Sequence, residues 1–98
     1  MATIRIPGAL RTLTGGNADI EVSAATVREA LVELDKRHPG VVAKVLDDAG
    51  AVKPFIRIYV RAEDIGGLSG LDTAVSDRDE IDIIPAIAGG AARGMTDA

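Results

Sequence analysis

Cysteine is absent from this chain of 98 residues, and aromatic side chains are almost absent. Without a thiol the chain forms no disulfide, thiolate metal site or cysteine nucleophile. Phe55 and Tyr59 are the only aromatic residues, so the platforms on which single-stranded nucleic acids stack are missing. The formal charge of -4 also argues against binding to a phosphate backbone, which needs a basic surface. These absences exclude nucleic acid as a partner and require any sulfur to be supplied from outside.

Long apolar runs are missing as well. No stretch approaches the roughly 20 residues of a membrane-spanning helix, and the N-terminus begins with a strand pattern instead of a signal peptide. We therefore expect a cytoplasmic protein with no membrane partner. Hydrophobic residues make up 47% of the chain, enough for one aliphatic core. We expect one domain over residues 1–90, followed by an extension over residues 91–98.

Alternating apolar and polar residues predict four β-strands, over residues 2–6, 19–22, 55–61 and 81–84. Between the second and third strands, Thr26 and Glu29 form a capping box at the start of a helix. Pro39 ends this helix, because a residue before proline avoids the helical conformation. A short helical turn over residues 41–46 follows. Residues 9–14 are expected to be irregular, with Leu10 and Leu13 as anchors, and residues 63–70 to be rich in turns.

The order of these elements favours an α+β fold. The first and last strands are both apolar and lie far apart in the sequence, so we expect them to pair in parallel at the centre of a mixed sheet. One main helix packed across one face then buries both apolar surfaces. This is the β-grasp, or ubiquitin-like, arrangement.

Three features that could suggest a site have simpler explanations. His38 is the single histidine and lies at the helix end, where a cation suits the helix dipole. The acidic residues between 77 and 82 lack the ligand spacing of a calcium loop. Residues 66–70 are rich in glycine but are not followed by the Lys-Ser/Thr of a phosphate-binding loop. With no credible nucleophile, base or metal cluster, we expect no enzyme and no bound cofactor or metal.

Strand alternation predicts a mixed surface on the sheet face that the helix leaves open. Aromatic, aliphatic and arginine side chains are expected there: Phe55, Tyr59, Ile84, Arg5, Arg57 and Arg61. Such a mixture suits a protein partner. Pro85, Ala86 and Ile87 extend the expected partner-binding surface toward the C-terminus.

The last strand leads to Gly89-Gly90. A pair of glycines is in itself weak evidence, and a simple flexible tail is the alternative interpretation. However, two residues without a Cβ let an extended tail enter a narrow enzyme channel, so that a carboxylate at Gly90 reaches an activating site. Once adenylated, this carboxylate is an electrophile that can accept sulfur.

Three stretches carry a family resemblance: residues 55–65, 70–79 and 83–90, the last reading Ile83-Ile84-Pro85-Ala86-Ile87-Ala88-Gly89-Gly90. They resemble the ThiS/MoaD family of sulfur carrier proteins, and the ending is most similar to the CysO-type carriers of actinobacterial cysteine biosynthesis. The likeness covers residues 2–90. It implies a β-grasp carrier whose Gly90 is adenylated by an E1-like, ATP-dependent enzyme and converted to a thiocarboxylate, with Gly89 as its flexible neighbour. CysO-like systems further imply a PLP-dependent cysteine synthase and a JAMM-type zinc protease as partners.

Residues 91–98 depart from the family pattern, which ends at the two glycines. While they are attached, the carbonyl of Gly90 belongs to an amide and cannot be adenylated. We expect cleavage between Gly90 and Ala91, with the JAMM-type protease as the first candidate. Other roles stay open: the small subunit of molybdopterin synthase, a carrier for thiamine or secondary metabolites, a protein modifier, and a β-grasp module that binds a protein through its sheet.

Overall fold

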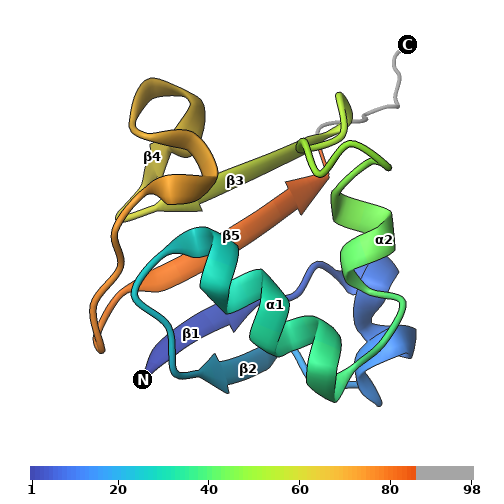
Figure 1. The fold of residues 1–98 in the computed structure, drawn as a ribbon. Coiled ribbons are helices and arrows are strands. Elements are labelled where there is room, and N and C mark those ends of the chain that lie inside the picture. The colour runs from blue at the N-terminus through green and yellow to red at the C-terminus, as the bar shows by residue number, and fades with distance from the viewer. Residues whose placement is uncertain (86–98) are drawn as a thin grey trace, which may run out of the picture.

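A mixed sheet of five strands, in the order β2-β1-β5-β3-β4, runs through the computed structural model, which describes residues 1–85 (Figure 1). The strands are β1 (Ala2–Arg5), β2 (Asp19–Val22), β3 (Ile56–Val60), β4 (Glu63–Asp64) and β5 (Glu80–Pro85). β1 and β5 pair in parallel at the centre, and the other neighbouring strands are antiparallel. This confirms the predicted pairing of the first and last strands.

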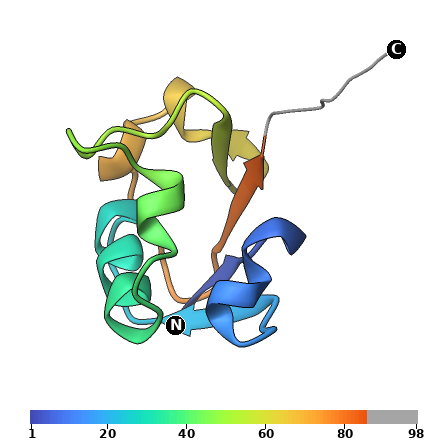
Figure 2. The same ribbon diagram turned by 90° about the vertical axis from the view of Figure 1, so that its right-hand side faces the viewer.

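The helices cover one face of this sheet. α1 (Val27–Arg37) is the main helix, and α2 (Val42–Val45) follows it. Three 3-10 helices, η1 (Gly8–Thr14), η2 (Ile65–Gly67) and η3 (Gly70–Asp72), lie in the connections. Figure 2 shows α1 and α2 on the same side of the sheet. The arrangement is the β-grasp fold that the sequence predicts. Within residues 1–85, no helix has the length and apolar character needed to cross a membrane.

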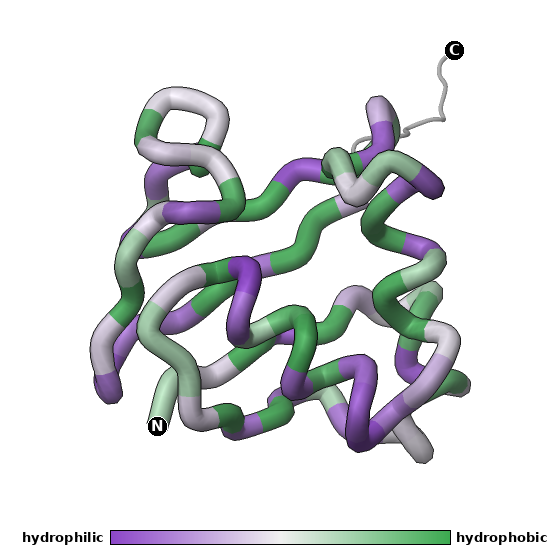
Figure 3. Tube along the Cα trace, in the orientation of Figure 1, coloured by the Kyte–Doolittle hydropathy of each residue, from purple (hydrophilic) through white to green (hydrophobic). Residues whose placement is uncertain are grey.

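The core fills the space between the sheet and α1. Ile4, Ile58 and Ile81 of the three central strands are at most 1% exposed. Leu31 and Leu34 of α1 pack in the same cluster and are equally buried. Figure 3 shows hydrophobic residues along the central strands. Because strand side chains alternate between faces, the residues directly before and after each of these isoleucines point to the face without helices.

The ends of α1 agree with the predicted signals. The Glu29 N–H donates to the Thr26 hydroxyl oxygen at 3.2 Å, and the Ala25 N–H donates to the Glu29 carboxylate at 3.0 Å. At the other end, the His38 N–H donates to the Leu34 carbonyl at 2.8 Å. His38 thus lies at the helix terminus, as the sequence indicates.

The predicted turn-rich passage after the third strand is wrong at its start, because Glu63–Asp64 forms the short strand β4. β3 and β4 are joined by Arg61 and Ala62, whose φ angles are 54° and 65°. Positive φ at both central residues is what a type I′ hairpin turn requires. Arg61 therefore lies in a turn and not on the strand face where it was predicted.

The connection after β1 also differs from prediction. Residues predicted to be irregular form the 3-10 helix η1, and Leu13, a predicted anchor, is 37% exposed. Thr14 is the fully buried residue instead. Its hydroxyl lies 2.8 Å from the Asn17 carbonyl and donates to it, so its burial leaves no polar group unpaired.

Candidate functional site

The point at which the C-terminal segment begins is fixed by the end of β5. Pro85, the last residue of β5, lies opposite Ile56 of β3. The predicted site residues beyond it lie outside the described residues: Ala86, Ile87, Gly89, Gly90 and Ala91. The structure therefore describes the surface from which the Gly-Gly segment departs, and that surface is the candidate site.

Exposed apolar side chains surround this point. Phe55 is 60% exposed and Ile84 is 44% exposed. Pro85 is also exposed, whereas Tyr59 is half-buried. Phe55 lies in the turn just before β3, and Ile84 lies opposite Arg57. We call the set Phe55, Ile84 and Pro85 the tail-base patch.

The three arginines expected on the open face form ion pairs within the fold. Each lies within ion-pairing distance of a carboxylate: Arg5 near Asp19 and Glu80, Arg57 near Asp64, and Arg61 near Asp79. The pairs of Arg5 and Arg57 are exposed on both sides, and exposed pairs contribute little to stability. The arginine side chains stay about half exposed, so the mixed surface carries charges of both signs.

A surface hollow of about 480 Å³ adjoins the tail-base patch. Its walls come from the end of β1, from η1 and from β5, and include Arg11, Asp82, Ile84 and Pro85. The Arg11 Nε–H donates to the Ile6 carbonyl at 3.1 Å, which anchors this arginine to the end of β1. Sequence reasoning missed Arg11, because only the folded path of η1 brings it beside β5.

Asp79 holds together the turn that precedes β5. Its carboxylate accepts from the Ser76 N–H at 2.8 Å and contacts Arg61, and its side chain is only 12% exposed. The pKa of Asp79 is lowered, chiefly by the hydrogen bond from the Ser76 backbone and further by the charge of Arg61, while burial acts in the opposite direction. This supports the structural interpretation of the acidic residues 77–82. Within the described part of the chain, no three His, Asp or Glu side chains gather as metal ligands would.

A β-grasp body whose central strand is followed in the sequence by Gly89-Gly90 is typical of a ubiquitin-like carrier protein. The family model described as the ThiS family matches residues 4–90. The chain belongs to the ThiS family.

Two known carriers show the closeness of this relationship. The sulfur carrier protein CysO of Mycobacterium tuberculosis is 36% identical over 90 residues, which cover 90% of this chain and 97% of that protein. Its crystal structure matches with a TM-score of 0.84 and 32% identity, over 89% of this chain and 100% of that one. The crystal structure of the Amycolatopsis orientalis BexX/CysO complex contains a chain that matches with a TM-score of 0.86 and 39% identity. That match covers 92% of this chain and 100% of the other. The chain is therefore a sulfur carrier protein of the CysO type.

Proposed function

We propose that this chain carries sulfur as a thiocarboxylate on Gly90, after residues 91–98 have been removed. The observation that carries the proposal is the end of the family match at Gly90, with residues 91–98 lying beyond it. Hydrolysis of the peptide bond between Gly90 and Ala91 would leave Gly90 with a free carboxylate. This maturation step turns an unreactive amide into a group that can be activated.

Activation then follows ordinary acyl chemistry. A carboxylate oxygen of Gly90 attacks the α-phosphorus of ATP on an E1-like enzyme, pyrophosphate leaves, and an acyl adenylate forms. A sulfur donor displaces AMP and leaves the thiocarboxylate. The carrier supplies the carboxylate, and the partner supplies the site for ATP. Gly89 and Gly90 have no Cβ, so they suit a narrow channel that leads to this site.

The tail-base patch is the surface on which we expect the activating enzyme to dock. Phe55, Ile84 and Pro85 are exposed around the start of the segment that the enzyme must receive. Aromatic and aliphatic side chains form the centre of many protein interfaces. Tyr59 is half-buried on the same sheet face and would lie at the rim, and Ala86 and Ile87 would continue the contact.

Cysteine biosynthesis is the pathway that the CysO relatives favour. In this scheme the thiocarboxylate sulfur attacks an aminoacrylate held by a PLP-dependent cysteine synthase. A JAMM-type zinc protease then releases cysteine and regenerates the carrier. ATP, PLP and zinc are thus expected in the partner enzymes and not in this chain.

Intact-mass analysis of the protein from its host cytosol tests this proposal. We expect a species that ends at Gly90, part of it heavier by the exchange of one oxygen for sulfur. If only the full-length mass is found, even under sulfur starvation, the carrier proposal fails for this chain. A β-grasp module that binds through its sheet face then becomes the better interpretation.

A further inference from the structure

The primary amines of the chain are few, and their positions matter for an activated Gly90. The sequence contains three lysines, Lys36, Lys44 and Lys53, in addition to the N-terminal amine. An acyl adenylate reacts with amines as well as with sulfur nucleophiles. Arginine does not compete, because its guanidinium stays protonated. This inference rests on the proposed activation of Gly90.

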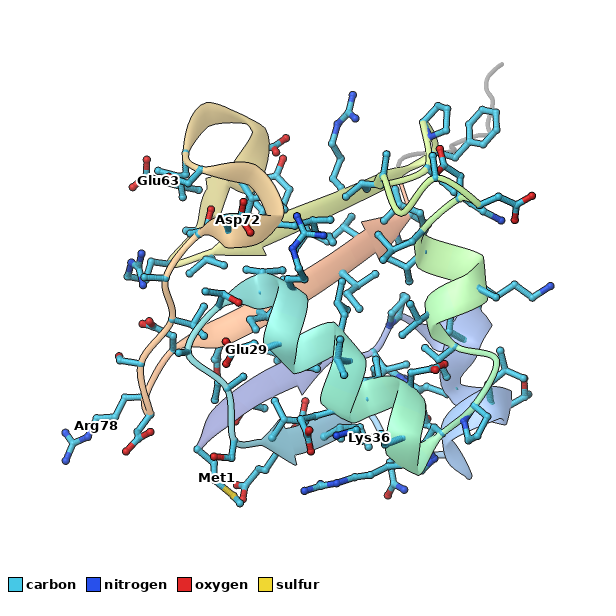
Figure 4. All side chains as sticks on the ribbon, viewed as in Figure 1. Met1, Glu29, Lys36, Glu63, Asp72 and Arg78 are labelled. Atoms are coloured by element: carbon cyan, nitrogen blue, oxygen red, sulfur yellow. The ribbon has the colours of Figure 1, made fainter. Side chains whose placement is uncertain are left out.

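The N-terminal amine lies at the wrong end of the sheet to react. Because β1 and β5 are parallel, Thr3 lies opposite Glu80, at the start of β5. The Met1 amine lies 3.7 Å from Asp77, and Figure 4 shows Met1 far from the arrowhead of β5. Glu80 and Pro85 are the first and last of the six residues of β5, and each step along the strand adds about 3.3 Å.

Lys53, in contrast, lies next to the point where the tail begins. Ile56 is the strand partner of Pro85, and the Ile56 N–H donates to the Lys53 carbonyl at 3.0 Å. Such a turn holds the Cα atoms of Lys53 and Ile56 within about 7 Å, and paired Cα atoms of antiparallel strands are about 5 Å apart. The Cα of Lys53 is therefore at most about 12 Å from the Cα of Pro85.

Residues 86–90 are long enough to span the distance between Pro85 and Lys53. Residues 86–90 connect Pro85 to Gly90, and five residues span at most about 17 Å when extended. Lys53 is also held in place, because its N–H donates to the Val45 carbonyl at 2.9 Å. A reactive carbonyl tethered this close to an amine has an effective concentration on the order of millimolar.

The other two lysines are less favourably placed. Lys44 precedes Val45, so the path from Pro85 to Lys44 runs through Lys53 and Val45. Lys36 is in the last turn of α1 (Figure 4), and its Nζ lies 3.1 Å from the Glu33 carboxylate. Lys36 therefore belongs to the end of α1, an element with no strand partner at Pro85.

We propose that Lys53 is a self-acylation site, which captures Gly90 when the activated carboxyl is not taken by a sulfur donor. The neutral Nζ of Lys53 attacks the carbonyl carbon of Gly90, and a C–N bond forms. The C–O bond to the adenylyl phosphate breaks, AMP leaves with the electron pair, and the nitrogen loses a proton to solvent. The product is a chain closed by an isopeptide bond. It has no free carboxylate and carries no sulfur, so it is withdrawn from sulfur transfer.

The test uses residues 1–90 prepared with Gly90 as the thioester of a small thiol. This chain retains every described residue and needs no enzyme to make Gly90 electrophilic. In dilute solution at mildly alkaline pH, hydrolysis gives the free acid, whereas self-acylation gives a product lighter by one water. We expect this lighter product, with a tryptic cross-link between Lys53 and Gly90. Lys53→Arg should lower its yield about tenfold or more, given the loss of the tethered amine. The matched variants Lys44→Arg and Lys36→Arg should leave it unchanged.

Two results overturn the proposal: no closed product from the native sequence, or the same yield from Lys53→Arg. Unfolding in urea provides a control for the geometry, because the three lysines should then share the reaction. The thioester experiment does not depend on an activating enzyme. Failure of the proposed function is seen separately, as the absence of ATP–pyrophosphate exchange with the mature chain.

Discussion

Phe55 provides the most direct test of docking at the tail-base patch. Its side chain is 60% exposed, and a phenylalanine buries on the order of 200 Å² when fully covered. A partner that covers the exposed part would remove about 120 Å² from water, worth about 3 kcal/mol at about 25 cal/mol per Å². Alanine keeps one methyl group, so the expected loss for Phe55→Ala is about 2 kcal/mol, or about 30-fold in affinity.

The assay is ATP–pyrophosphate exchange by the host activating enzyme with the mature chain as substrate. We expect Phe55→Ala to raise KM about 30-fold with little change in kcat, because the side chain contributes to binding and not to chemistry. Val32→Ala is the matched control. Val32 is 50% exposed on α1, on the other side of the sheet from the open face. Both variants should unfold in urea almost as the native chain does, because both side chains are largely exposed.

An unchanged KM for Phe55→Ala would refute the proposed docking surface. An equal rise in KM for Val32→Ala would show that loss of any exposed apolar side chain has this effect.

Two further predictions concern stability. Ala62 has a φ of 65°, a conformation that glycine adopts at no steric cost, so Ala62→Gly should stabilise the fold by about 0.5–1 kcal/mol in urea unfolding. Equal or lower stability would contradict the strained-turn interpretation. The pKa of Asp79 is lowered in the folded state, so its carboxylate stabilises the fold above the unfolded pKa and loses this contribution as the pH falls through the folded pKa. Asp79→Asn should therefore cost more stability at pH 7 than near pH 2, and an equal cost at both would exclude this linkage.

Local signals predicted the elements whose causes are local. The Thr26–Glu29 capping box marks the start of α1, and the alternating isoleucines identify the central strands. The hairpin between β3 and β4 was missed for an equally local reason. Arg61-Ala62 lacks the Asn-Gly or Asp-Gly pattern that announces a type I′ turn. The ion pair between Arg61 and Asp79, which are far apart in sequence, helps to hold this turn.

In the candidate site, too, the sequence predicted only the features that have local causes. Strand alternation was sufficient to predict that Ile84 is exposed on the open face. It could not show that Arg5 and Arg57 form ion pairs, because their carboxylate partners come from other strands. Nor could it place Lys53 beside Pro85, which requires both the β3–β5 register and the turn before β3.

The central position of β5 links docking to self-acylation. Because β5 lies between β1 and β3, a partner that receives the Gly-Gly segment must approach the sheet at the end where Pro85 lies. Phe55 and Lys53 belong to the same turn at this end. An activating enzyme docked on Phe55, as proposed, would cover the approach to Lys53 and would hold Gly90 in its own site. The two proposals together then predict that docking and self-acylation exclude each other, so that closure would occur only when an activated Gly90 leaves its enzyme without sulfur.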